Sequence, residues 1–436
     1  MKKAGKILPI AYYLLLAIQV IFCILWVAKS SLKLPLIYEG SIYLEAARAM
    51  KFDEYSGVIY PLFLRFIYLG MSNISGRITV AGLQLVALLL SAVFLINRIK
   101  RMSAVTIELK SLDIVLILLH FITFPLVAYI IFLMTPEAFA LSFFMVWCGY
   151  LFDDKKKPLD IFLMVTAYIL AGFMSIKYAY IIGIIWLVYI LVMNRSKIFL
   201  NLARWISGIC FIIIMNILFI TPGCYGRMPA SMGTGLVCNY SYEVLVHDHF
   251  FWPEEAKAAI PFENLGNILM DRSHVVTKMG EPLLNNYSYW KTDILGLQIA
   301  KASIMVRSRE TIDRFLGNVS DYLLTPVTFL ENINGQGKSS SAINIYSMAG
   351  GDSRLAVMYM LLGLIIYSLI IILASFGKIF DKKTFSFWLM MYLVASVFWA
   401  LFAFNYFDYM LMMPVIAFGL ILLSTKWRLI CKSICK

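Results

Sequence analysis

The stretch LPIAYYLLLAIQVIFCILWVA, at residues 8–28, contains no charged residue. A helix of this length rises about 30 Å, which is the thickness of the hydrocarbon core of a bilayer. The run is too long for the apolar region of a cleaved signal peptide, and no small-residue cleavage site precedes Pro35. The stretch therefore predicts a membrane-spanning helix close to the N-terminus.

Nine further apolar stretches follow along the chain, separated by polar connections. Together they predict an all-α, polytopic membrane protein with about ten transmembrane helices. The predicted spans are residues 8–28, 78–97, 113–133, 137–152, 159–175, 178–193, 205–221, 355–375, 385–404 and 410–425.

Lysine and arginine gather on every second connection. Short basic connections stay on the cytoplasmic side of a membrane, so both termini are expected in the cytoplasm and the alternate connections outside. We expect a plasma-membrane, multi-pass protein with large extracytoplasmic loops. The basic positions are Lys2, Lys3, Lys6, Arg98, Lys100, Arg101, Lys110, Lys155, Lys156, Lys157, Arg195, Lys197, Arg204, Lys378, Lys382, Lys383, Lys426, Arg428, Lys432 and Lys436.

The composition agrees with a membrane protein, because 61% of the residues are hydrophobic and 14% are charged. Soluble domains average about 25% charged residues. The formal net charge of +13 could indicate nucleic-acid binding, but 20 of the 38 basic residues lie on the basic connections. There they act as orientation signals and as partners of lipid headgroups, so we expect no nucleic acid.

Two of the outward connections are large, at residues 29–77 and 222–354. They divide the chain into an N-terminal membrane domain (1–221), an extracytoplasmic domain (222–354) and C-terminal membrane helices (355–436). The extracytoplasmic domain contains amphipathic, helix-like runs that need no isolated core, and its Gly/Ser-rich stretch at 334–341 is expected to be a mobile gate. The runs extend from Pro253 to Ile260, Glu263 to Lys278, Tyr289 to Val306 and Glu310 to Leu323.

The acidic residues avoid the middle of the predicted membrane spans. Glu137 and Asp408 lie at the outer ends of spans, and the other acids lie on connections. Carriers driven by protons or sodium usually place carboxylates near the middle of the bilayer. Their absence argues against a coupled transporter.

The first outer connection carries Glu39, Tyr43 and Ala47 at four-residue steps, so the three share one face of a short helix. A carboxylate held at the membrane surface can accept a proton from an attacking hydroxyl group. From spacing alone, Glu39 is more simply explained as a solvated acid near a helix N-terminus, stabilised by the helix dipole.

Further short motifs lie on the outward side. Tyr60-Pro61 follows the first helix, Pro136-Glu137 opens the fourth span, Lys177 opens the sixth, and residues 405–409 precede the last. In this order the set resembles the polytopic glycosyltransferases of the GT-C fold, the superfamily of protein mannosyltransferases and aminoarabinose transferases. The resemblance covers about the first 200 residues and the last 35, and it does not include the large outer domain.

The resemblance implies transfer of a sugar from a polyprenyl-phosphate donor to an envelope glycan, lipid or protein, with Glu39 as the general base. Many relatives carry Asp or two acids at this position, so Asp53 and Glu54 remain alternative catalytic residues. Relatives also open the last span with Arg-Tyr, where this chain has Asp408-Tyr409. No metal and no other cofactor is expected. The implied substrate-binding residues are Tyr43, Tyr60, Glu137, Lys177, Asp408 and Tyr409.

Other interpretations of the sequence stay open. The chain could transport or flip a lipid-linked envelope precursor, or it could be an adhesion or assembly scaffold. His247 and His249 supply two ligands for a metal, but a third is not evident nearby. Exposed aromatic clusters at 250–252 and 287–290 could stack on sugar rings or rest on the headgroup layer. Cys224 and Cys238 could form a disulfide or remain free thiols.

Overall fold

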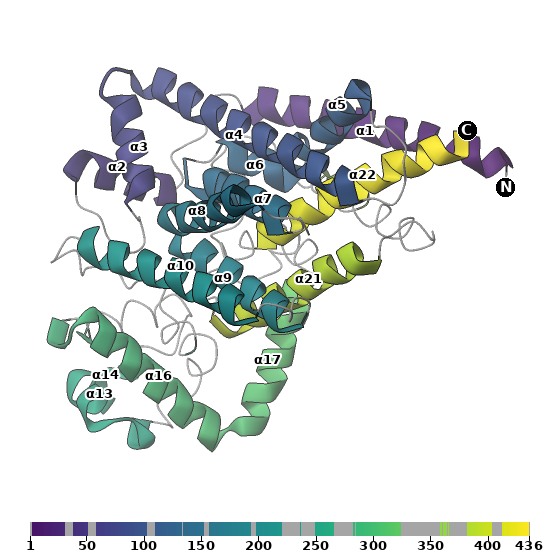
Figure 1. Cartoon of the computed structure of the whole chain (residues 1–436). Helices are drawn as coiled ribbons and strands as arrows, with labels where there is room; N and C mark the ends of the chain where they lie inside the picture. The colour runs from purple at the N-terminus through teal and green to yellow at the C-terminus, as the bar shows by residue number, and fades with distance from the viewer. Residues whose placement is uncertain are drawn as a thin grey trace.

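The computed structural model is all-helical, and no strand occurs among the residues that it describes (Figure 1). The apolar helices indicate a membrane protein. The described residues are 2–30, 38–50, 58–102, 110–132, 134–151, 157–192, 198–219, 249–265, 285–323, 382–402 and 412–435, with 236, 282–283, 358–359, 361–363 and 365 as isolated positions.

Helices occupy most of the predicted spans and also the larger outward connections. The principal helices are α1 (Lys2–Ser30), α2 (Tyr38–Ala49), α3 (Ile59–Tyr68), α4 (Asn73–Met102), α5 (Ser111–Ile122), α6 (Pro125–Phe132), α7 (Glu137–Leu151), α8 (Pro158–Met174), α9 (Ile176–Val192), α10 (Ile198–Phe219), α13 (Glu254–Ala259), α14 (Phe262–Leu265), α16 (Tyr289–Val306), α17 (Ser308–Leu323), α21 (Lys382–Phe402) and α22 (Met413–Cys435), with a 3-10 turn, η2, at His249–Phe251.

Two of the described helices are long and apolar enough to cross a membrane, at Ile74–Lys100 and Phe385–Phe402. The bent pair α5 and α6 would make a third span. Several other apolar helices are shorter: α7, with 15 residues, rises only about 22 Å. The predicted span at 355–375 lies almost entirely outside the described residues, and the number of ten spans stays a prediction.

The predicted third span, 113–133, is wrong as a single helix, because it breaks between α5 and α6 with a bend of 73°. Pro125 lacks the backbone N–H that would continue the helix. The hydroxyl of Thr123 donates a 2.6 Å hydrogen bond back to the carbonyl of Leu119. Two buried side chains bind the carbonyl groups at the break: Gln19 Nε2 donates to His120 O at 3.0 Å, and Tyr359 donates its hydroxyl to Thr123 O.

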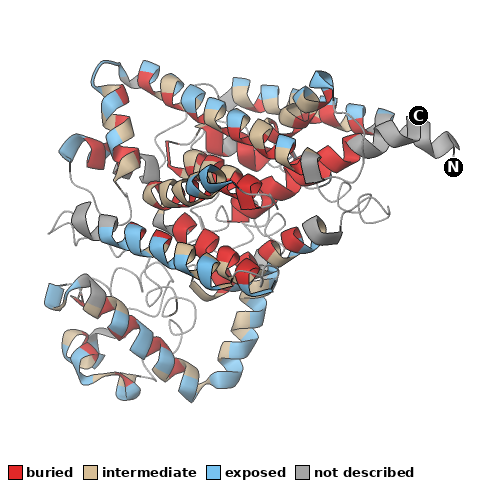
Figure 2. Ribbon diagram, in the orientation of Figure 1, coloured by how far each residue is buried: buried red, intermediate tan, exposed pale blue. Residues whose placement is uncertain are grey.

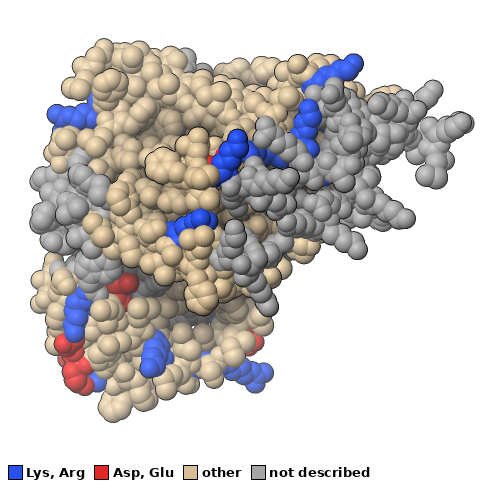
Figure 3. Space-filling model, in the orientation of Figure 1, with Lys and Arg blue, Asp and Glu red and all other residues tan. Residues whose placement is uncertain are grey.

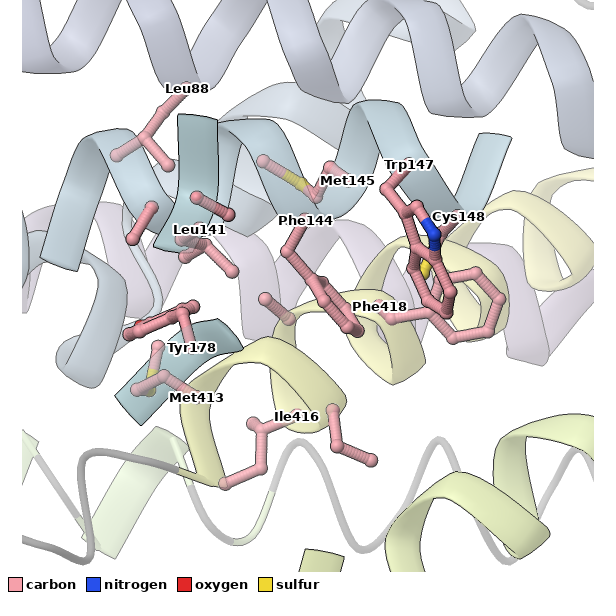
Figure 4. Packing of buried hydrophobic residues seen from close by; sticks show 14 of the residues in the cluster. Leu88, Leu141, Phe144, Met145, Trp147, Cys148, Tyr178, Met413, Ile416 and Phe418 are labelled. Carbon is pink, nitrogen blue, oxygen red and sulfur yellow. The ribbon is translucent and has the colours of Figure 1, made fainter. Parts of the chain in front are cut away.

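Helix α7 forms the centre of the bundle. It packs against α4 and α8 and contacts α22, whose residues 412–428 are all buried (Figures 1 and 4). Phe144, Trp147 and Phe418 fill the space between these helices. Helices α1, α4 and α10 expose many of their apolar residues, and Figure 2 shows the exposed positions along these helices. Such an exposed apolar surface is expected where lipid surrounds the helices.

A buried ion pair joins α22 to α5. Arg428 Nη2 lies 2.5 Å from Asp113 Oδ1, and the two side chains are only 6% and 3% exposed. The Nη1 of Arg428 also donates to the hydroxyl of Tyr13 on α1, at 2.8 Å. The other carboxylate oxygen of Asp113 accepts the backbone N–H of Lys110 and so caps α5. We expected Arg428 to lie on a cytoplasmic connection as an orientation signal and a partner of lipid headgroups. The structure corrects the headgroup role, because Arg428 is buried and bonds to Asp113 of α5 and Tyr13 of α1.

Asp160 repeats this arrangement at the start of α8. Its Oδ2 accepts the backbone N–H of Lys157 at 3.0 Å, and its Oδ1 lies 3.4 Å from Arg98 Nη2 on α4. The guanidinium group of Arg98 also rests on the rings of Phe94 and Tyr150. Both acids therefore cap one helix while holding an arginine of another.

Residues 249–323 contain a small helical unit with its own core. The buried residues include Trp252, Leu283 and Leu295. Of the two arrangements open to the amphipathic runs, packing against one another or lying on the membrane, the described part shows the first. Helix α16 has the bounds that the sequence predicted, Tyr289–Val306. Helix α17 packs against α21, where Asn318 Nδ2 donates to Ala400 O at 3.5 Å. On the face in Figure 3, acidic side chains lie mostly on this lower unit, whereas the charged side chains visible on the helix bundle above it are mostly Lys and Arg.

We predict that Arg428→Leu lowers the free energy of unfolding by about 3–5 kcal/mol, because it leaves the carboxylate of Asp113 buried without its cation. Denaturant titration of the purified protein in detergent measures the loss. Arg307→Leu is the control, since Arg307 pairs with Glu310 at the surface and should cost about 0–1 kcal/mol. Equal losses in the two variants would contradict an internal role for Arg428.

Candidate functional site

The four-residue pattern of the first outer connection forms the predicted helix, α2. Tyr43 and Ala47 are buried, so the face on which the pattern places them points into the protein. Glu39 occupies the same face one turn earlier, at the second residue of α2. The side chain of Glu39 lies outside the described part of the structure. The role of Glu39 as a general base therefore stays a prediction.

Helix α3 packs against α2 and brings a second tyrosine to Tyr43. The rings of Tyr43 and Tyr60 meet edge to face, with centroids 5.4 Å apart. Phe139, on the first turn of α7, lies 6.3 Å from the ring of Tyr60. Arg65 fixes the two short helices together, since its Nη1 donates to the carbonyls of Ala47 and Arg48 at 3.2 and 3.3 Å. The first connection is thus anchored on the start of α7.

A side chain of α4 forms a hydrogen bond to the turn that precedes α7. Gln84 is buried, and its Nε2 donates a 3.0 Å hydrogen bond to the carbonyl of Thr135. Pro136 and Glu137 follow, and the half-buried Glu137 lies in the first turn of α7, where the helix dipole stabilises a carboxylate. This arrangement explains why the sequence has Pro-Glu at this point: proline sets the backbone that enters the helix, and glutamate complements its N-terminus.

Glu137 acts on two buried tyrosines from different parts of the chain. Burial raises the pKa of Tyr60 well above its ordinary value of 10.0, and the nearby carboxylate of Glu137 raises this pKa further. Tyr60 therefore remains a neutral hydrogen-bond donor at physiological pH. The same carboxylate acts electrostatically on Tyr178, in the first turn of α9. Glu137 thus lies near one tyrosine of the first outer connection and one tyrosine of α9.

We call Tyr60, Thr135, Glu137 and Tyr178 the Glu137 cluster. The hydroxyl groups of Tyr60, Thr135 and Tyr178 are buried and form no hydrogen bond within the described part of the protein. Buried polar groups are usually satisfied, so a set of unsatisfied hydroxyls beside a carboxylate is typical of a site that holds water or a polar ligand. Three hydroxyls of this kind near Glu137 would suit a ligand rich in hydroxyl groups.

The structure therefore brings together three of the predicted site residues, Tyr43, Tyr60 and Glu137. Lys177 is the second residue of α9 and directly precedes Tyr178, although its side chain is not described. The other predicted site residues fall outside the described ranges, and so does the gate at 334–341. These site residues are Asp53, Glu54, Asp408 and Tyr409.

The aromatic and histidine residues of the outer unit differ in how far they are buried and in what they contact. Trp252 is buried in the unit's core, so it is not available to stack on a sugar, whereas Phe250 and Phe251 are exposed. His249 donates from Nε2 to the carbonyl of Ile260 at 3.0 Å and packs on Trp252. This bond gives His249 a structural role. Among the described residues, no group of three or more His, Cys, Asp or Glu is placed to hold a metal ion.

Sequence reasoning missed Tyr178 and Thr135, although both adjoin motifs that it identified, at Lys177 and at Pro136-Glu137. It also missed Gln19 and His120, which are buried at the break between α5 and α6. From the sequence we located only the acidic residues relative to the spans, so we did not consider amide and imidazole side chains within them. Counting every polar residue in an apolar run would have found both.

Comparisons of this chain with protein-family models, with curated proteins and with solved structures give no match.

We predict that Tyr60→Phe changes the free energy of unfolding by less than about 0.5 kcal/mol, because the deleted hydroxyl has no hydrogen-bond partner among the described residues. Tyr60→Ala, in contrast, should cost about 3–5 kcal/mol through the cavity that it leaves. Both losses are measured by denaturant titration in detergent. A cost near that of the alanine variant for Tyr60→Phe would show that the hydroxyl is bonded inside the protein.

Proposed function

We propose that this chain is a membrane glycosyltransferase that transfers a sugar from a polyprenyl-phosphate donor to an acceptor in the cell envelope. The observation that supports this proposal best is the Glu137 cluster, whose buried hydroxyls and carboxylate suit a ligand rich in hydroxyl groups. The cluster lies beside α2, the helix that carries Glu39. We place the enzyme in the plasma membrane, with about ten GT-C-like spans, cytoplasmic termini and an extracytoplasmic site.

In the proposed reaction, the Glu39 carboxylate takes the proton of the acceptor hydroxyl. The acceptor oxygen then forms a bond to the anomeric carbon of the sugar, while the bond from that carbon to the donor phosphate oxygen breaks. The polyprenyl phosphate leaves with the bonding electron pair. A single displacement of this kind needs one base and inverts the anomeric carbon. The acceptor is a glycan, a lipid or a protein of the envelope.

The donor's lipid chain would remain in the membrane, so its phosphate would lie at the bilayer boundary. Lys177 is our proposed partner for this phosphate, because it lies one residue before Tyr178 at the start of α9. A cation at this place stabilises the charge that develops on the leaving phosphate. Tyr43, Tyr60 and Glu137 would orient the sugar, and Asp408 and Tyr409 are proposed to complete the donor site.

We predict that Glu39→Gln lowers turnover by at least about 100-fold, since a lost general base typically costs 10²- to 10⁴-fold. The assay follows transfer of radiolabelled sugar from a membrane fraction of polyprenyl-phosphate sugars to envelope acceptors. Glu45→Gln is the matched control, because Glu45 is an exposed acid on the same helix and should retain full activity.

Full activity of Glu39→Gln would exclude Glu39 as the base. In that case Asp53→Asn and Glu54→Gln, made separately, identify which of the remaining acids of the connection accepts the proton. Loss of activity in the Glu45→Gln control would mean that α2 needs its acids for folding.

A transporter or flippase of a lipid-linked envelope precursor is the second candidate. The break between α5 and α6 favours it, because discontinuous helices with buried polar groups often line transport pathways. Gln19 and His120 would then contact the headgroup as it crosses the membrane.

Purified protein in liposomes separates the two functions. We predict a new glycosidic bond when a labelled polyprenyl-phosphate sugar and an acceptor extract are added, with no change in the movement of the labelled lipid between leaflets. Accelerated movement without a new glycosidic bond would establish the transporter. If neither signal appears while the protein remains folded, the scaffold interpretation is favoured.

A further inference from the structure

Helix α3 has two apolar faces, and only one of them packs against the protein. Tyr60, Leu64 and Ile67 are buried against the bundle. On the opposite side, Phe66 and Leu69 are 77% and 73% exposed, and Leu62 is exposed as well. These three residues follow one another at helical spacing, so they form a continuous apolar stripe along the outside of α3.

The stripe continues onto a helix that is long enough to cross a membrane. Ile74 and Ile78 are exposed in the first turns of the candidate span Ile74–Lys100. The exposed stripe of α3 and the exposed apolar residues at the start of α4 therefore lie close together in the chain, separated by the turn at Gly70, Met71 and Ser72. Whatever covers the start of α4 is in a position to cover α3.

Helix α3 does not itself span the bilayer. Its 10 residues rise about 15 Å, which is half the thickness of the hydrocarbon core. Figure 1 shows α3 running across the end of α4 rather than continuing its direction. If α4 crosses the membrane, α3 lies along the membrane surface with its stripe directed away from the bundle.

The polar groups around α3 suit the headgroup layer. Arg65 is the one charged residue in the sequence of α3, and Arg77, in the first turns of α4, is hydrogen-bonded to Tyr68 at the end of α3. Arginine beside an exposed apolar face is typical of helices that rest between headgroups and acyl chains. Tyrosine is also enriched at this depth.

We propose that α3 is an interfacial helix whose stripe of Leu62, Phe66 and Leu69 is embedded among the acyl chains of bilayer phospholipids, just below their headgroups. The lipid rather than a protein is the occupant, because the stripe directly precedes a candidate membrane span whose first turns also expose apolar residues. Membrane contact would then hold Tyr60, on the opposite face of α3, at a fixed depth next to Glu137. This proposal does not depend on the glycosyltransferase function.

Photo-crosslinking tests the proposal. The photoreactive residue benzoylphenylalanine replaces Phe66 in the full chain, which is reconstituted in vesicles of phosphatidylethanolamine and phosphatidylglycerol. Leu90, exposed near the middle of the same span, is the lipid-facing control, and Glu254, exposed on α13, is the aqueous control. Mass spectrometry detects a mass increase of one phospholipid and locates the attachment point on the acyl chain.

We expect a phospholipid adduct at positions 66 and 90 and none at 254. The attachment at position 66 should lie nearer the ester end of the acyl chain than the attachment at position 90. A lipid adduct at 90 but not at 66 would overturn the proposal. A crosslink from position 66 to another protein chain, or an attachment as deep as that at position 90, would overturn it as well.

Discussion

A guanidinium group buried among helices needs a carboxylate, and the pairing of Arg428 with Asp113 meets this need. The pair joins the last helix of the chain to α5, which lies more than 300 residues earlier, and Tyr13 adds α1 to the same group. Helix α22 can therefore lie enclosed among the other helices from residue 412 to 428 although it carries charge. We infer that the packing of the bundle around α7 depends on this ion pair.

The acidic residues at the two ends of the bundle have different surroundings. At one end, Asp113 and Asp160 each cap a helix and bind an arginine, so their carboxylates serve the fold. At the other end, Glu137 lies among buried hydroxyls that have no hydrogen-bond partner in the described part of the chain. Unsatisfied polar groups cost stability, and a protein keeps them where they bind something. Buried hydroxyls without a described partner also occur near Arg428, at Ser424 and Thr425. We place the function at the end that carries α2 and α3 because the predicted site residues Tyr43 and Tyr60 lie there beside Glu137.

Sequence patterns predicted local structure well and long-range pairing poorly. Four-residue spacing predicted that Glu39, Tyr43 and Ala47 share a helix face, and amphipathic spacing predicted α16 with its correct bounds. Periodicity reports on neighbours along one helix. It does not report that Arg428 meets Asp113 or that Glu137 acts on Tyr178, because those contacts depend on how distant helices pack. The break before Pro125 was predictable from proline chemistry, but the high apolar content of residues 113–133 concealed it.

A structure of the protein with a bound polyprenyl-phosphate lipid is the most direct test of the account. We predict that the lipid phosphate lies at the end of the bundle formed by α2, α3 and the first turns of α7 and α9, within reach of Lys177 and the Glu137 cluster. A phosphate bound at the opposite end, near Asp113 and Asp160, would contradict the assignment of the site.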